Sequence, residues 1–359
     1  MNKLLIACLA AGAIAMGVGA ARADNRGAPL WLDAETFATL PEGVRYPEGL
    51  TANPATGDIY AATFDFGPNA NKLVRFSRSG RVSAVKDFGG TPLLGLGFAG
   101  GKVYILNFGA SRIQRIAADF DASTVVEDVA AWAVPSIGAP GPRIVTNNPD
   151  GSADTITFGS NHFPAPNAMV FDTAHNLYVS DSFQGAIWRV DNATTCPTPC
   201  AINLYKQDPL LATAGFPPFG ANGLALSADG TAMYIANTGD NRVLKMDMTA
   251  ASHALTVFAE SVHGADGLLL DNGLLWVAAN QGDEIVALNG RGRPVARAGS
   301  FEGIRRDGTP RGLLFPASMA IVGDWMYVTN LALPLTATVG DEPEEDVTRW
   351  TLSRIRLPR

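Results

Sequence analysis

The sequence predicts an all-β fold, namely a six-bladed β-propeller with four antiparallel strands in each blade. Three observations predict it: a repeated three-strand pattern, the spacing of that pattern, and a Gly- and Pro-rich composition with few stretches typical of helices. The clearest copy of the pattern is residues 222–246, NGLALSADGTAMYIANTGDNRVLKM. Apolar residues alternate over 224–226, Asp229 and Gly230 supply a tight turn, and a second apolar run follows at 233–236.

The same order of runs and turns recurs along the chain. Related segments begin at Asp266, Asn167 and Glu48, and looser ones begin at Leu94 and Ser318. The second strand of each unit centres on an aromatic residue, and these residues are Tyr60, Tyr104, Tyr178, Tyr234, Trp276 and Tyr327. Most of the intervals between them are about 40 to 50 residues, which is the period of a propeller blade.

The composition is compatible with one large β domain covering residues 24–359. The chain has 359 residues with 38 Gly and 23 Pro, and 47% of its residues are hydrophobic, enough for a sizeable core. The segment 30–43 resembles the fourth strands of other units, while the last unit ends after its third strand. We therefore expect the N-terminal strand to complete the sixth blade and close the ring, which removes two open sheet edges.

The first 23 residues are typical of a secretory signal peptide. Lys3 precedes an apolar run over 4–18, and Ala21-Arg22-Ala23 forms a cleavage site of small residues. The apolar run is shorter than the roughly 20 residues needed to cross a bilayer. The sequence thus predicts an exported protein, periplasmic or extracellular, without membrane insertion.

The charge of the chain disfavours some partners. Removing Lys3 and Arg22 with the signal changes the net charge from -7 to -9, and no basic cluster remains. Nucleic acid is therefore not expected as a partner. We expect a monomer that acts on a small molecule.

Two cysteines follow the signal segment, Cys196 and Cys200 in CPTPC. In an oxidising compartment this spacing predicts a disulfide within a long loop of the third unit. A zinc site or redox pair is the weaker alternative, since two thiols alone do not complete a zinc site.

The interval between the second and third units contains an insertion, residues 134–163, rich in Gly, Pro and Asn. We expect a loop or short hairpin over the mouth of the molecule, where it could gate the site. A surface loop without a role is the alternative.

Residues that open the first strand of each unit should converge at one end of the central channel, because those strands line it. They are Glu48, Leu94, Asn167, Asn222, Asp266 and Ser318. Two carboxylates and two amides among them form a set of oxygen ligands suited to Ca²⁺, with Mg²⁺, Mn²⁺ or Zn²⁺ as alternatives. Asn and Asp also cap turns, but four residues with carboxylate or amide oxygens at one phase of the repeat favour a metal site.

The ends of the second strands should lie at the same end of the ring, since paired strands are antiparallel. We expect polar residues there to contact substrate or water: Asp65, Asn107, Asp181, Ser182, Asn237, Thr238, Asn280 and Asn330. Some of them are expected only to terminate strands.

These residues carry a family resemblance over 30–359. The motifs E-G-L at Glu48, N-A-M at Asn167, N-G-L-A-L-S-A-D-G at Asn222 and D-G-L at Asp266 resemble the SMP-30/gluconolactonase-like family of six-bladed propellers. That family is related to the paraoxonase-type lactonases and the diisopropyl fluorophosphatases. The resemblance implies that Glu48, Asn167, Asn222 and Asp266 bind a catalytic divalent ion, usually calcium.

The resemblance also implies a reaction, the metal-assisted hydrolysis of a lactone or related ester. Asp266 would act as general base or as nucleophile, and the residues leave that choice open. His162, five residues before Asn167, could be a second base or a substrate contact, or only a loop histidine. The alternative from another functional class is a non-catalytic NHL-like propeller that serves as a ligand- or protein-binding scaffold.

Overall fold

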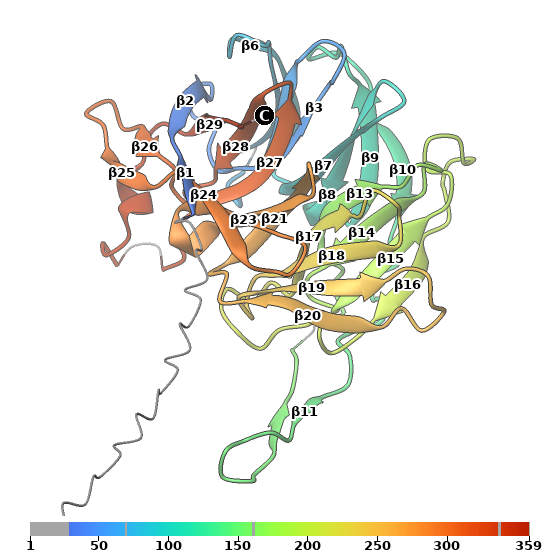
Figure 1. Ribbon diagram of the computed structural model, residues 1–359. Helices are drawn as coiled ribbons and strands as arrows, with labels where there is room; N and C mark the ends of the chain where they lie inside the picture. Colours follow the sequence, from blue (N-terminus) through green and yellow to red (C-terminus); the bar gives the residue numbers. More distant parts are fainter. Residues whose placement is uncertain (1–28, 69, 160–161, 337–338, 359) are drawn as a thin grey trace, which may run out of the picture.

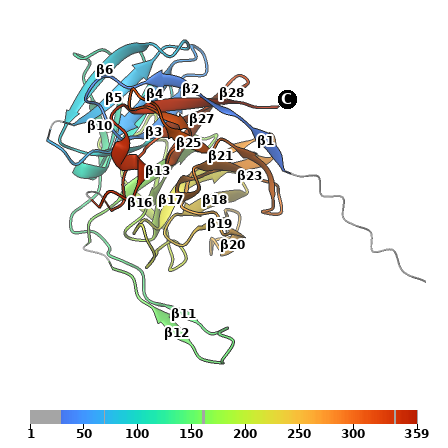
Figure 2. The same ribbon diagram turned by 90° about the vertical axis from the view of Figure 1, so that its left-hand side faces the viewer.

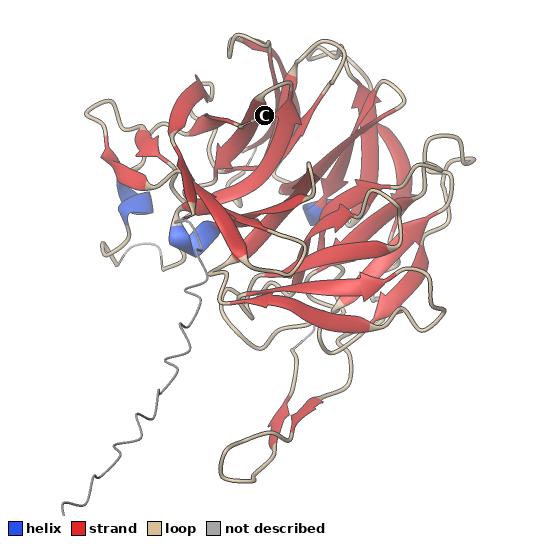
Figure 3. Ribbon diagram, in the orientation of Figure 1, coloured by secondary structure: helices blue, strands red, loops and turns tan. Residues whose placement is uncertain are grey.

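The computed structural model confirms the predicted six-bladed propeller and describes residues 29–68, 70–159, 162–336 and 339–358. The predicted signal peptide, residues 1–23, lies outside them. Figure 1 shows the blades arranged around a common centre, and Figure 3 shows that the described fold consists of strands joined by loops, with only short helical turns. The inner strands are β3 (Pro47–Ala52), β7 (Leu93–Ala99), β13 (Pro166–Phe171), β17 (Ala221–Leu226), β21 (Ala265–Asp271) and β27 (Pro316–Val322).

Each inner strand is followed outward by three more antiparallel strands. The second strands are β4 (Ile59–Thr63), β8 (Lys102–Asn107), β14 (Leu177–Asp181), β18 (Ala232–Asn237), β22 (Leu274–Ala279) and β28 (Trp325–Asn330). The third strands are β5 (Asn71–Phe76), β9 (Arg112–Ala117), β15 (Ala186–Val190), β19 (Arg242–Asp247), β23 (Glu284–Leu288) and β29 (Thr351–Arg356). The outer strands are β6 (Val82–Gly89), β10 (Glu127–Ala131), β16 (Asn203–Gln207), β20 (Leu255–Glu260), β24 (Pro294–Ala298) and β2 (Ala34–Thr39).

Short elements decorate the blades. They are β1 (Leu30–Leu32), the hairpins β11 (Arg143–Val145) with β12 (Asp154–Ile156) and β25 (Phe301–Ile304) with β26 (Pro310–Gly312), and the 3-10 turns η1 (Phe108–Ala110), η2 (Asn280–Gly282) and η3 (Pro343–Asp346). Within the described residues, no helix is long and apolar enough to cross a membrane.

The N-terminal segment closes the ring, as predicted. Strand β2 pairs antiparallel with β29 and completes the sixth blade. Strand β1 adds a second closure that the sequence did not predict, because it pairs parallel with β24 of the fifth blade. One short segment therefore joins the last two blades and covers the outer edges of both sheets.

The aromatic residues of the second strands connect neighbouring blades. The Tyr60 hydroxyl of the first blade donates to the carbonyl oxygen of Ala118 in the second, at 2.9 Å. The Tyr104 hydroxyl of the second blade donates to the carbonyl oxygen of Ala193 in the third, at 3.2 Å. Both rings are buried, so each combines apolar packing with a satisfied polar tip.

A bulge near the start of every inner strand positions the residues that face the centre. In the first blade Pro47 pairs with Thr63, but the next pair is Leu50 with Ala61, so one extra residue is accommodated. The same register shift occurs in all six blades. The second residue of each strand is therefore equivalent, and these residues are Glu48, Leu94, Asn167, Asn222, Asp266 and Ala317.

The residue after each of these positions is small because adjacent inner strands approach closely around the ring. A Cβ atom on Gly223 would clash with the carbonyl oxygen of Asp266 in the next inner strand. A Cβ on Gly267 would likewise clash with the carbonyl oxygen of Ala317. The Asn-Gly and Asp-Gly dipeptides thus combine a group facing the centre with space for the neighbouring blade.

The predicted disulfide and insertion both have counterparts in the structure. Cys196 and Cys200 form a disulfide in the loop between β15 and β16, with their Cα atoms 5.7 Å apart. The insertion forms the hairpin of β11 and β12, which projects from the body of the propeller (Figures 1 and 2). At its base Arg143 contacts the Asp240 carboxylate at 3.2 Å, so the hairpin is attached beside the fourth blade.

Candidate functional site

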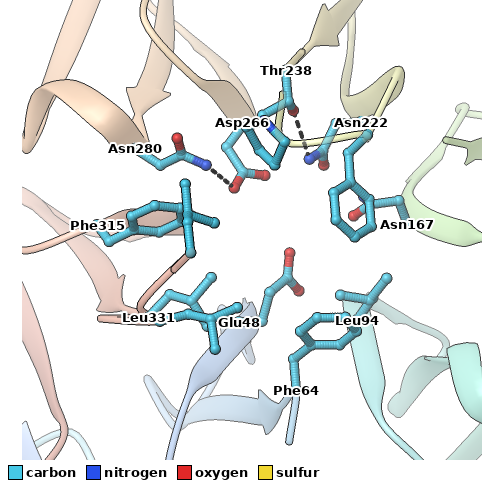
Figure 4. Close-up of a pocket in the computed structure, with 14 residues that line it drawn as sticks. Glu48, Phe64, Leu94, Asn167, Asn222, Thr238, Asp266, Asn280, Phe315 and Leu331 are labelled. Atoms are coloured by element: carbon cyan, nitrogen blue, oxygen red, sulfur yellow. Dashed lines mark hydrogen bonds between the residues drawn. The ribbon is translucent and has the colours of Figure 1, made fainter. Parts of the chain in front are cut away.

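A pocket lies at the end of the central channel where the inner strands begin. The residues lining it are Glu48, Phe64, Leu94, Asn167, Pro217, Phe219, Asn222, Thr238, Asp266, Asn280, Phe315, Leu331, Leu333 and Leu335. Four of them are the predicted ligands Glu48, Asn167, Asn222 and Asp266, each no more than 5% exposed. The structure therefore brings together the two carboxylates and two amides that the repeat phase predicted. Figure 4 shows the Glu48 carboxylate pointing toward the other three.

Several oxygen atoms in this group have no hydrogen-bond partner although they are buried. They include Glu48 Oε2, Asn167 Oδ1 and Asp266 Oδ1. A buried acceptor without a partner costs on the order of 1–3 kcal/mol, and more when it is charged. Three such atoms facing one pocket indicate a site built for a ligand that accepts lone pairs from oxygen.

Two hydroxyl groups fix the orientation of the asparagine amides. Ser182 Oγ donates to the carbonyl oxygen of Ala221 at 2.7 Å, so it accepts from Asn167 Nδ2 at 2.9 Å. Thr238 Oγ1 donates to the carbonyl oxygen of Ala265 at 2.7 Å and accepts from Asn222 Nδ2 at 3.0 Å.

Since each hydroxyl already uses its hydrogen, the group facing it must be the amide NH₂ rather than the amide oxygen. The carbonyl oxygens of Asn167 and Asn222 are consequently free of these contacts. The same arrangement in two adjacent blades presents two uncharged amide oxygens to the pocket.

The two carboxyl groups influence one another. Burial raises the pKa of the Glu48 carboxyl well above its ordinary value, and the negative charge of Asp266 raises it further. Burial also raises the pKa of Asp266 to about 7, although the hydrogen bond from the Asn280 side chain opposes the shift. Asn280 Nδ2 donates to Asp266 Oδ2 at 3.0 Å, which holds the carboxyl group in place (Figure 4). Two buried like charges without a cation are unfavourable.

The remaining wall of the pocket is apolar and comes mainly from the sixth, first and second blades. Phe64 and Leu331 occupy one phase of the repeat, directly after the second strands β4 and β28. Thr238 and Asn280 occupy the same phase after β18 and β22. The polar half of the pocket therefore faces an apolar half that the sequence analysis did not predict.

Comparisons with known proteins agree with this architecture. Residues 213–298, which span the fourth and fifth blades with Asn222 and Asp266, match the family described as "SMP-30/Gluconolactonase/LRE-like region". The chain carries an SMP-30/gluconolactonase/LRE-like region. This match confirms the predicted resemblance over residues 213–298, which contain the motifs at Asn222 and Asp266. No curated protein sequence matches the chain.

Solved structures share this six-bladed fold at low identity. A luciferin-regenerating enzyme is 17% identical, with a TM-score of 0.58 over 92% of this chain and 95% of that one. The calcium-binding protein regucalcin from Agrobacterium tumefaciens is 15% identical, with a TM-score of 0.57 over 92% and 97%. A gluconolactonase from Xanthomonas campestris is 13% identical, with a TM-score of 0.55 over 90% and 89%.

Most of the predicted second-strand residues stabilise the propeller rather than line its pocket. Asn107 accepts from the backbone NH of Ala110, and Asn237 donates to the carbonyl oxygens of Leu210 and Ala212. Asn330 accepts from the backbone NH of Leu314. These three asparagines end their strands, and the pocket-facing position is the next residue along.

Two acidic residues from the same prediction are also engaged elsewhere. Asp65 forms an ion pair with Arg45 at 2.9 Å. Asp181 accepts from Trp188 Nε1 at 3.1 Å and from backbone NH groups, so its buried carboxyl is well satisfied. Of the predicted set, Asn280 and Thr238 line the pocket. Ser182 does not line it, but its hydroxyl accepts a hydrogen bond from the amide of Asn167, which does.

Two further predictions differ from the structure. Ser318 stands one residue after the pocket-facing phase, which Ala317 occupies, so the sixth blade offers no polar group there. His162 does not line the pocket: it is exposed, and its Nδ1 atom lies 2.9 Å from the carbonyl oxygen of Ser136 within the insertion. The described residues of 134–163 do not line the pocket, but Phe163 at the end of the insertion contacts the Phe108 ring beside it, with centroids 5.6 Å apart.

Proposed function

We propose that the protein is an exported, calcium-dependent hydrolase of lactones or related esters. The observation that carries the proposal is the convergence of Glu48 Oε2, Asn167 Oδ1 and Asp266 Oδ1, all buried and without partners, at one pocket. The name of the regucalcin structure describes calcium binding, and that of the Xanthomonas protein describes a gluconolactonase; both are consistent with this proposal.

The donor set fits calcium or magnesium better than zinc. Carboxylate and amide oxygens are hard ligands, whereas zinc favours histidine nitrogen and cysteine sulfur. Within the part of the chain that the structure describes, no three or more His, Cys, Asp and Glu residues are grouped to hold a metal. Glu48, Asn167, Asn222 and Asp266 would hold the ion, and its two positive charges would offset the two buried carboxylates.

The residues around the ion would carry out the hydrolysis. A bound divalent ion supplies Lewis-acid polarisation of the substrate carbonyl. Asp266 Oδ1 is available to take a proton from the water that attacks the carbonyl carbon, because Asn280 occupies Oδ2. The carbon–oxygen bond to the leaving alkoxide then breaks, and the same proton is passed to that oxygen. In the alternative route, Oδ1 attacks the carbonyl carbon itself, and an acyl-aspartate forms as the carbon–oxygen bond to the alkoxide breaks. Water then hydrolyses the acyl-aspartate, which restores the carboxylate and supplies the proton that the alkoxide takes up.

The first test is hydrolysis of a panel of lactones and aryl esters by the mature protein. We expect turnover that is abolished by a chelator and restored by calcium. A calcium-dependent rise in melting temperature without turnover of any substrate would favour the NHL-like scaffold, with a structural ion. If calcium changes neither turnover nor melting temperature, the ligand assignment is wrong.

A second prediction concerns Thr238, which orients the Asn222 amide without providing a ligand oxygen. We expect Thr238→Val to weaken calcium binding about 10- to 100-fold, as is typical when a group supporting a metal ligand is removed. Valine keeps the shape of threonine but leaves Asn222 Nδ2 without its acceptor. Isothermal titration with calcium measures the effect.

The matched control is Thr256→Val, which changes an exposed residue of the outer strand β20. This variant is expected to bind calcium as the wild type does. Equal calcium affinity of Thr238→Val and Thr256→Val would show that the hydroxyl of Thr238 does not position a ligand.

A further inference from the structure

The apolar wall of the pocket is part of a larger phenylalanine cluster. The Phe64 ring contacts the Phe108 ring edge-on, with centroids 5.5 Å apart, and the Phe66 ring at 4.9 Å. Phe183 contacts both Phe108, at 6.0 Å, and Phe219, at 5.6 Å. Phe64 and Phe219 line the pocket, so the cluster begins in the same cavity as the four proposed metal ligands.

This cluster also reaches the surface. Phe66 is 70% exposed, although a phenylalanine at that position gains nothing from contact with water. A continuous apolar path therefore leads from the wall of the pocket to solvent. Covering such a surface stabilises a complex by roughly 25 cal/mol for each Å² of apolar area removed from water.

The pocket offers little to a substrate rich in hydroxyl groups. The polar residues lining it beyond the four proposed ligands are Thr238 and Asn280. The Thr238 hydroxyl and Asn280 Nδ2 already hydrogen-bond within the site, which leaves Asn280 Oδ1 as their one atom without a partner. No Lys or Arg is among its lining residues, so an anionic group would also find no cationic side chain. Each hydroxyl that loses water without gaining a partner would weaken binding by about 1–3 kcal/mol.

We propose that the substrate is a neutral lactone or ester with an apolar alkyl or aryl substituent, which lies against the phenylalanine cluster. This inference rests on the proposed hydrolase activity for its reaction and on the apolar wall for its substrate class. The carbonyl group would face the ion held by the four proposed ligands, and the substituent extends past Phe64 and Phe219. A polyhydroxylated sugar lactone is a poor substrate of this site.

The test compares kcat/KM for glucono-δ-lactone with a series of γ-lactones of increasing alkyl length, all with calcium-loaded protein. We expect kcat/KM to rise about 4-fold for each added CH₂ group while the chain still contacts the cluster, from about 0.8 kcal/mol for each buried CH₂. Preference for glucono-δ-lactone together with a flat alkyl series would overturn the substrate class but leave the hydrolase proposal standing.

Two variants separate the cluster from the rest of the protein. Phe219→Ala should reduce the dependence on alkyl length and lower kcat/KM for the longest lactone about 10-fold or more. The control Phe258→Ala changes another half-buried phenylalanine, which contacts Tyr234 in the outer part of the fourth blade. It is expected to leave the whole series unchanged, and equal effects of both substitutions would overturn the inference.

Binding of the neutral fluorescent probe N-phenyl-1-naphthylamine tests the apolar site without any reaction. We expect saturable binding that Phe219→Ala weakens and Phe258→Ala does not. This result in a protein that hydrolyses no lactone would mean that the apolar site exists and the hydrolase proposal fails. Hydrolysis without specific probe binding or chain-length dependence would mean the reverse.

Discussion

Asp266→Asn is expected to abolish most hydrolysis, lowering kcat by about 10²- to 10⁴-fold even at saturating calcium. Asn280 Nδ2 donates to Asp266 Oδ2, so the new amide must keep its oxygen on that side. Its NH₂ group then replaces Oδ1, the atom that faces the pocket without a partner. The variant consequently loses a base or nucleophile and places two N–H donors toward the cation.

Glu48→Gln is the informative comparison because it removes the other buried carboxylate of the pocket. If Glu48 only binds calcium, this variant needs a calcium concentration at least about 10-fold higher, since charge count sets affinity. Its kcat should recover once calcium is saturating, whereas that of Asp266→Asn should not. Full recovery of both variants would remove Asp266 from the reaction and leave it as a ligand only.

Multiple turnovers in ¹⁸O-labelled water distinguish the two roles left open for Asp266. A nucleophilic aspartate incorporates ¹⁸O into its own carboxylate, because water cleaves the acyl-aspartate at either carbonyl. A general base incorporates none. Mass spectrometry of the peptide containing Asp266 reads the outcome.

The fold was predictable because the propeller repeats one local pattern six times. Each copy carries the same alternation, turn and central aromatic residue, so errors in one unit are corrected by the others. The repeat also predicted that β2 completes the sixth blade. The parallel pairing of β1 with β24 was not predictable from it, because that pairing depends on two segments far apart in the sequence and belongs to no repeat.

The sequence predicted the pocket residues of the inner strands correctly. It did not predict most of those that follow the second strands, because the pocket-facing position there is one residue away from the predicted one. Side chains alternate along a strand, so an error of one residue moves a group from the pocket to the opposite face. Asn107, Asn237 and Asn330 are polar and end their strands, but they stand one residue before the pocket-facing position. Aligning all second strands on Asn280 would have identified Phe64 and Leu331 as pocket residues and exposed the apolar half.

The bulge in the inner strands explains the analogous shift at Ser318. A sequence repeat locates a strand, but the extra bulge residue decides which side chain of a pair faces the centre. In the sixth blade the preceding residue, Ala317, takes that place. The Glu-Gly, Asn-Gly and Asp-Gly dipeptides of the other blades were unambiguous, because glycine has no side chain and only its partner can supply a functional group.

The metal-free protein is expected to lose stability as the pH rises, and calcium should restore it. The pKa of Asp266 is raised by burial from 3.8 to about 7 in the folded chain, and that of Glu48 is raised in the same direction. The folded state therefore binds more protons than the unfolded state between about pH 4 and pH 7. The resulting stabilisation is complete below the unfolded pKa values and is lost as pH rises through the folded ones, by about 1.4 kcal/mol per pH unit for each group.

Urea unfolding at pH 5.5 and pH 8, with chelator or with calcium, measures this dependence. Calcium should raise the free energy of unfolding strongly at pH 8 and little at pH 5.5, because protons compete for the same oxygens. Asp181, Asp283 and Glu344 also have pKa values raised by burial and contribute to the slope, so the comparison needs the double variant Glu48→Gln/Asp266→Asn. That variant should keep only their part of the slope. A calcium effect of equal size at both pH values would contradict a site in which Glu48 and Asp266 bind the ion.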